Sequence, residues 1–104
     1  MKRGEVWNVM VPMADRVRPV LVVTNDYANE DDDDHPHACD IAEAPAAGPY
    51  AVHLAERDPL PGQWVRVDTV AHYRRGRFIG PPVGIVTGAT LEQVDRALRD
   101  RLDL

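Results

Sequence analysis

The sequence predicts a mainly β fold, a small barrel or sandwich, that ends in one helix. Short stretches rich in β-branched and apolar residues are separated by Gly and Pro, which is typical of small all-β folds. The spacing of the apolar residues becomes helical only near the C-terminal end. At 104 residues the chain is long enough for one core and too short for two, so we expect a single domain over 1–104.

Each predicted strand ends at a turn or loop signal. The first, Glu5–Met10, is followed by a short connection, residues 12–16. The second, Arg18–Asp26, is nearly continuously apolar and closes on an Asn-Asp turn signal, so we expect it to be buried. Further strands are predicted at Ala38–Ala42, Ala51–Leu54, Trp64–Val70 and Val83–Thr87.

A helix is predicted after the last strand. Thr90 followed by Gln93 fits a capping box, in which Ser or Thr precedes Glu or Gln by three residues. The apolar residues then form one stripe at helical spacing: Leu91, Val94, Leu98 and Leu102. We expect this helix to cover the core rather than to bind a partner.

The composition excludes several function classes. Lys and Arg number 12 and Asp and Glu 17, and this net charge of −5 disfavours loose binding to nucleic acid. A single cysteine, Cys39, excludes an internal disulfide, and we expect it to fill space in the core. The longest apolar run is too short to span a membrane, so we expect a cytoplasmic protein. Phosphate loops and nucleophile elbows are also absent, and we expect no cofactor.

A local basic cluster remains possible within this acidic chain. Guanidinium groups beside aromatic rings suit single-stranded RNA, which needs both phosphate contacts and stacking surfaces. The alternative is a solvated loop beside a core tryptophan. The basic members are Arg66, Arg74, Arg75 and Arg77, and the aromatic ones are Trp64, His72, Tyr73 and Phe78.

Two acid-containing segments could carry chemistry. On a strand, Arg66 and Asp68 project to one side while Val65 and Val67 point into the core. Such a pair is either a surface ion pair or a metal-free site in which the carboxylate deprotonates a ribose 2′-OH and the arginine assists the phosphate. The acidic tract, residues 30–34, lies beside His35 and His37, but adjacent aspartates repel one another, so we expect a solvated loop and no metal site.

The chain resembles the MazF/PemK/Kid family of toxin endoribonucleases over essentially its whole length. The opening Arg3-Gly4-Glu5-Val6-Trp7 is similar to the first strand of that family. The Arg-Pro of Arg18–Asp26, followed by a run of Val and Leu, is similar to its most recognisable segment. Trp64–Asp68 resembles the strand that carries Arg-x-Asp, and residues 84–104 resemble the final strand and helix.

The resemblance implies an SH3-like barrel with a C-terminal helix, usually a homodimer. It implies cleavage of single-stranded RNA without metal, which leaves a 2′,3′-cyclic phosphate and a 5′-OH, and inhibition by a cognate antitoxin. By position, Arg18, Arg66 and Asp68 match catalytic residues of the family. Arg16 joins Trp64 and the three arginines of residues 74–77 as an RNA-binding candidate.

Two departures from the family keep an alternative open. The strand-end Ser or Thr of the family is missing, and Glu43 lies in the matching stretch as a weaker candidate for the base. The connection at residues 12–17 is also several residues shorter than is usual. A weakly active or inactive member of the family, or a CcdB-like toxin that binds a protein target, would tolerate both departures. Convergence of Arg18, Arg66 and Asp68 on one site would favour RNA chemistry.

Overall fold

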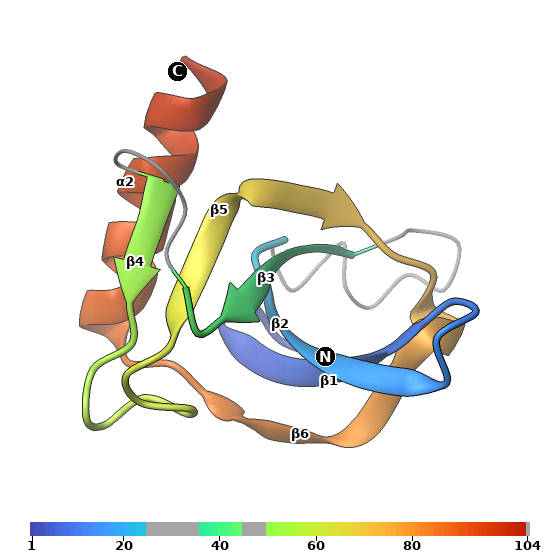
Figure 1. Ribbon diagram of the computed structural model, residues 1–104. Coiled ribbons are helices and arrows are strands. Elements are labelled where there is room, and N and C mark those ends of the chain that lie inside the picture. The colour runs from blue at the N-terminus through green and yellow to red at the C-terminus, as the bar shows by residue number, and fades with distance from the viewer. Residues whose placement is uncertain (25–35, 45–49, 104) are drawn as a thin grey trace.

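The computed structural model describes residues 1–24, 36–44 and 50–103. Its strands are β1 (Glu5–Val11), β2 (Arg16–Val22), β3 (His37–Ala42), β4 (Ala51–His53), β5 (Trp64–His72) and β6 (Phe78–Ile85). A 3₁₀ helix, η2 (Arg75–Arg77), precedes β6, and the helix α2 (Gly88–Leu102) follows it. The strands form one six-stranded antiparallel sheet in the order β4-β5-β3-β2-β1-β6. Figure 1 shows this sheet curling strongly, with α2 standing beside β4 and β5. The predicted mainly β fold with a C-terminal helix is confirmed.

The two faces of the sheet bury different side chains, because successive residues of a strand point to opposite sides. One face packs against α2 through a core that includes Leu21, Val65 and Val94, all fully buried. The other face holds a smaller cluster made of Val9, Val20, Ala38 and Tyr73, with Trp7 and Phe78 packed against it. The site described below extends this second face, on the side of the sheet away from α2.

The last strand begins five residues earlier than the sequence predicts, at Phe78 instead of Val83. Pro81 and Pro82 therefore lie inside it. They are tolerated because β6 is an edge strand that pairs with β1 alone. The N–H that proline lacks would there face no second strand. The second strand also begins earlier, at Arg16, and ends at Val22, whereas the predicted end at Asp26 lies outside the described residues.

The cap of α2 is Thr87, three residues before the predicted Thr90. The Thr87 hydroxyl accepts the Thr90 N–H, and both threonines bind the buried carboxylate of Asp58, a tertiary contact that local sequence does not reveal. The predicted apolar stripe is only partly confirmed, since Val94 is buried but Leu102 is 57% exposed. Ala97 and Thr90 are buried instead.

Some predictions fall outside the described residues. These are the acidic tract, residues 30–34, and His35 beside it. In the part of the chain that is described, no helix is long and apolar enough to cross a membrane.

Candidate active site

The alternation predicted for β5 places Arg66 and Asp68 together. Val65 and Val67 are fully buried in the core against α2, and the two charged side chains project from the opposite face. Arg66 Nη2 donates to Asp68 Oδ2 at 3.2 Å, and the two side chains are 37% and 32% exposed. Their inner atoms, Arg66 Nε and Asp68 Oδ1, are buried without a hydrogen-bond partner among the described residues. The ion pair thus leaves one donor and one acceptor unsatisfied.

Arg18 is held in a triangle of three polar contacts. Its Nη2 donates to the Tyr73 hydroxyl at 3.3 Å, and its Nε lies 3.5 Å from Asp40 Oδ1. The Tyr73 hydroxyl in turn donates to the same Asp40 oxygen at 3.2 Å. Burial, and next the Asp40 carboxylate, raise the pKa of Tyr73, so its hydroxyl remains a donor at neutral pH. Arg18 is therefore fixed along one edge while 44% of its side chain is exposed.

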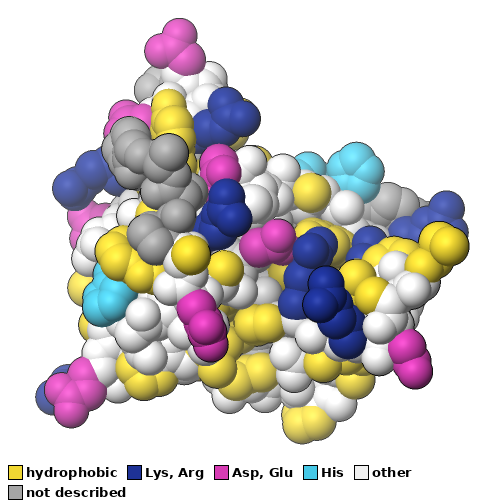
Figure 2. Space-filling view, viewed as in Figure 1, with side chains coloured by type: hydrophobic (Ala, Val, Ile, Leu, Met, Phe, Trp, Pro, Cys, Tyr) yellow, Lys and Arg dark blue, Asp and Glu magenta, His cyan; other side chains and the backbone are white. Residues whose placement is uncertain are grey.

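The sheet register joins this triangle to the pair on β5. Asp40 is the direct cross-strand partner of both Val20 on β2 and Arg66 on β5, and direct partners project to the same side. We call Arg18, Asp40, Arg66 and Asp68 the charged quartet. Figure 2 shows positive and negative side chains gathered next to one another over β5, β3 and β2. Arg18, Arg66 and Asp68, whose convergence would favour RNA chemistry, lie on one face of the sheet, with Asp40 of β3 between Arg18 on β2 and Arg66 on β5.

A threonine fixes the strands beneath the quartet. The pairing of β3 with β5 is irregular between Ala38 and Asp40. At this point Thr69 accepts the Asp40 N–H at 2.8 Å and donates its hydroxyl to the Arg66 carbonyl at 2.7 Å. The hydroxyl thereby replaces a missing ladder contact and holds β3 against β5 where Asp40 and Arg66 meet.

The other predicted residues surround the quartet or lie apart from it. Trp64 is two residues before Arg66 on β5, and its ring contacts that of His53. Arg77 lies over the Tyr73 ring, 5.0 Å from its centroid, and donates to the Met10 carbonyl. Glu43 is exposed just beyond the end of β3. The remaining basic candidates are Arg16 and Arg74, both exposed, and Arg75, which is half-buried.

Three residues of the site were missed by the sequence analysis: Asp40, Tyr73 and Thr69. Asp40 carries a usable signal, because a charged residue between Cys39 and Ile41 in an apolar strand must face away from the core. Tyr73 was noted only as one aromatic residue of the basic cluster. Thr69 gives no local signal, since its role depends on which strands pair.

Cys39 fills core space, as predicted. It is fully buried on the face of β3 opposite Asp40. Burial, with repulsion from the Asp40 and Asp68 carboxylates, raises its pKa to about 12, so it is an unreactive thiol at neutral pH. Within residues 1–24, 36–44 and 50–103, no three His, Cys, Asp or Glu side chains gather in an arrangement that would hold a metal ion.

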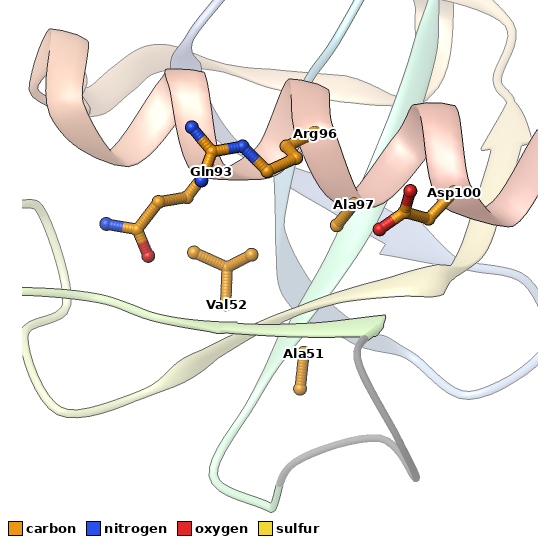
Figure 3. A pocket seen from close by; sticks show the side chains of 6 residues that line it. All are labelled: Ala51, Val52, Gln93, Arg96, Ala97 and Asp100. Carbon is orange, nitrogen blue, oxygen red and sulfur yellow. The ribbon is translucent and has the colours of Figure 1, made fainter. Parts of the chain in front are cut away.

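A separate hollow of about 250 Å³ lies between β4 and α2 (Figure 3). Its lining consists of Ala51, Val52, Gln93, Arg96, Ala97 and Asp100. Val52 points from β4 toward the helix, where the polar side chains surround the hollow. None of the residues predicted to act on RNA lines it, so the quartet and not this hollow is the candidate site for RNA chemistry.

Comparison with known proteins points to one family. The family model described as PemK-like, MazF-like toxin of type II toxin–antitoxin system matches residues 2–102. No curated protein matches the chain in sequence.

Solved structures share the fold. A mycobacterial endoribonuclease, solved in complex with its cognate antitoxin, is 26% identical with a TM-score of 0.87, over 100% of this chain and 96% of that one. MazF of Deinococcus radiodurans, in a MazE–MazF structure, is 21% identical with a TM-score of 0.80, over 100% and 96%. Mycobacterium tuberculosis toxin MazF-mt6 is 16% identical, also with a TM-score of 0.80, over 96% and 97%. The fold expected from the resemblance is confirmed.

Proposed function

Because the chain belongs to the PemK-like, MazF-like toxins of type II toxin–antitoxin systems, we propose that it is an endoribonuclease that cleaves single-stranded RNA. The observation that carries this proposal is the charged quartet. Two guanidinium groups and two carboxylates share one partly exposed face, as metal-free cleavage of a phosphodiester requires. Messenger RNA is the substrate we expect, with the cytoplasm as the place of action.

The proposed reaction is an attack by the ribose 2′-OH on the adjacent phosphate. Asp68 removes the 2′-OH proton, and the 2′-oxygen bonds to phosphorus. Arg18 neutralises the charge of the pentacovalent phosphate. The bond from phosphorus to the 5′-oxygen then breaks, and Arg66 stabilises or protonates the departing oxygen. The products are a 2′,3′-cyclic phosphate and a 5′-OH.

The partial exposure of the β5 pair supports this division of roles. The side chains of Arg66 and Asp68 are 37% and 32% exposed, so a substrate can approach both. Glu43 stays the weaker candidate for the base, because it lies beyond the end of β3.

RNA affinity would come from positive residues outside the quartet and from aromatic stacking. The quartet itself has no net charge, so it contributes little attraction for the backbone. We assign phosphate contacts to arginines outside it, and stacking to Trp64. The phosphate-binding residues are Arg16, Arg74, Arg75 and Arg77.

The partner proposed besides RNA is a cognate antitoxin. The mycobacterial relative that shares 26% identity was solved with its own antitoxin. We propose that the antitoxin of this protein inhibits it by covering the quartet with a flexible acidic segment, whose carboxylates would take the place of RNA phosphates on Arg18 and Arg66.

The function is tested by incubating the purified protein with a heteropolymeric single-stranded RNA in EDTA. We expect cleavage, with fragments that end in a 2′,3′-cyclic phosphate and begin with a 5′-OH. Cleavage that stops in EDTA contradicts the metal-free mechanism. If RNA is never cut while antitoxin still binds, the endoribonuclease proposal is wrong, and the protein is an inactive member of the family or a toxin that binds a protein target.

Replacing Tyr73 by phenylalanine is expected to lower kcat about tenfold with little change in KM. The variant removes one hydroxyl, which holds Arg18 and Asp40 together, and keeps the buried ring. Tyr73 is a positioning residue, so substrate affinity is largely retained. Tyr50→Phe, which alters a tyrosine packed against the core on the α2 side of the sheet, is the matched control. Equal kcat for Tyr73→Phe and the wild type contradicts the role.

We propose a homodimer, because the β6 edge exposes Ile79, Val83 and Ile85 at 38%, 44% and 58%. An edge strand that exposes several large apolar side chains is usually covered by a partner. Sedimentation at micromolar concentration should show a dimer, and Ile85→Asp should shift it toward monomer. Leu102→Asp, which alters an apolar residue exposed to the same degree on α2, should not. A monomeric wild type contradicts the proposal.

A further inference from the structure

A partly exposed pair of rings lies at the β4 side of the quartet. His53 on β4 and Trp64 on β5 are direct cross-strand partners, with ring centroids 4.7 Å apart and planes inclined by 55°. Direct partners project to the same side of a sheet, and Trp64 shares its side with Arg66 two residues later. Both rings therefore lie on the face that carries the quartet.

Among the residues that the structure describes, the ring that contacts Trp64 is His53, on the β4 side. Trp64 has His53 as its partner on β4 and Ala42 as its partner on β3. The methyl group of Ala42 is too small to cover an indole. Trp64 thus has an aromatic ring as its direct partner on β4 and only a methyl group as its direct partner on β3, the strand from which Asp40 comes.

Trp64 contributes little to the folded core. It is half-buried and belongs to neither of the two buried clusters, although tryptophan is among the largest apolar side chains. His53 beside it is exposed. An aromatic surface that solvent reaches, placed next to a guanidinium group, is what unstacked nucleobases bind.

The position of Trp64 fits one base of a bound strand. Along β5, Trp64 and Arg66 are two residues apart, which corresponds to about 6.6–6.8 Å. This is about the reach from a phosphate to the base of a neighbouring nucleotide. RNA with its scissile phosphate at Arg66 would bring that base over the indole.

We propose that His53 and Trp64 form a nucleobase-stacking subsite, which binds the base beside the scissile phosphate of single-stranded RNA. The subsite rests on the proposed function. Trp64 supplies the stacking surface, and His53 supports the indole from the β4 side. Because every base has a π face, the subsite accepts different bases and serves mainly to hold the strand in register.

The test measures affinity for an RNA that the wild type cleaves, made uncleavable by a 2′-deoxy group at the cut position. We expect Trp64→Ala to weaken binding about 5- to 150-fold, the scale of one base stacked on an aromatic ring. Trp64→Tyr should retain most of the affinity, since it keeps a ring. His53→Ala should have a smaller effect than Trp64→Ala. His37→Ala, which alters an exposed histidine at the start of β3, is the matched control and should bind like the wild type.

A second measurement identifies the base. The same RNA is made with an abasic nucleotide at each position in turn. An abasic nucleotide at one position beside the cut should weaken RNA binding by the wild type. The same abasic RNA should bind Trp64→Ala as tightly as intact RNA does, because the stacking contact is already lost in that variant. The subsite is overturned, while the proposed function stands, in either of two cases. In the first, the abasic nucleotide and Trp64→Ala weaken binding additively; in the second, Trp64→Ala binds intact RNA as tightly as the wild type does. A wild type that binds no single-stranded RNA overturns both.

Discussion

Replacing Arg18 by alanine is expected to reduce cleavage of single-stranded RNA by about 100-fold or more, the usual scale for one preorganised charge donor. Arg18 is fixed by Tyr73 and Asp40 along one edge and exposed along the other. Its guanidinium group can therefore meet the charge of the pentacovalent phosphate without first being ordered. The expected loss is in kcat, measured on the mapped cleavage site under saturating RNA.

Three comparisons isolate this role. Arg18→Lys keeps the charge but loses the planar fork, so it should recover only part of the rate. Arg18→Ala also leaves Asp40 without its cation, and the double variant with Asp40→Ala separates that effect from the loss of catalysis. Arg57→Ala, which alters an exposed arginine in the loop before β5, should cleave like the wild type.

The nucleophile is tested on the substrate. RNA with a 2′-deoxy group at the cut position should bind but remain intact, since the attacking oxygen is absent. Normal cleavage by Arg18→Ala, or cleavage of the deoxy substrate, shows that the mechanism proposed for the quartet is wrong.

The part of the site that lies within one strand could be predicted from the sequence. Alternation in β5 alone places Arg66 beside Asp68 and buries Val65 and Val67, because the side-chain period of a strand is two. The family resemblance added Arg18, which no local pattern connects to β5. The mainly β fold class could be predicted from the same alternation within the strands and from the turn signals between the strands.

The rest depended on contacts between distant segments. Asp40 is the cross-strand partner of Arg66 only because β3 pairs with β5 across an irregularity. The sequence of neither strand alone determines the register in which two distant strands pair. Tyr73 reaches Arg18 across 55 residues of sequence. The start of α2 was misplaced for the same reason, since Thr87 and Thr90 are both held by a residue from a loop before β5.

That residue, Asp58, is expected to be the most costly polar side chain to remove for stability. It is 4% exposed and accepts three hydrogen bonds: from the Ala55 N–H at 2.7 Å, the Thr87 N–H at 2.8 Å and the Thr90 hydroxyl at 2.6 Å. The carboxylate thus joins the loop before β5 to the positive end of α2. Asp58→Ala would leave three donors without this acceptor, among them the buried Thr90 hydroxyl, at a cost of about 3–4 kcal/mol.

Urea unfolding at one fixed protein concentration measures this cost. Glu56→Ala, which removes an exposed acid two residues away in the same loop, should change the free energy of unfolding by less than about 0.5 kcal/mol. Asp58→Asn, which keeps one carbonyl acceptor but no charge, should fall between the two. Equal stabilities of Asp58→Ala and Glu56→Ala contradict the role of Asp58.

The same contacts give the stability of the protein a defined dependence on pH. Burial acts to raise the pKa of Asp58, but the hydrogen bonds from Thr90, Thr87 and Ala55 outweigh it, and the pKa in the folded protein lies below the ordinary value of 3.8. A carboxyl group whose pKa is lowered by folding makes its full contribution to stability when the pH is above the ordinary pKa. This contribution is lost as the pH falls through the lowered pKa of the folded protein. The difference in unfolding free energy between the wild type and Asp58→Ala should therefore be constant near neutral pH and shrink below pH 3.8. A difference that stays unchanged in acid would mean that the carboxylate charge contributes nothing to holding α2 against this loop.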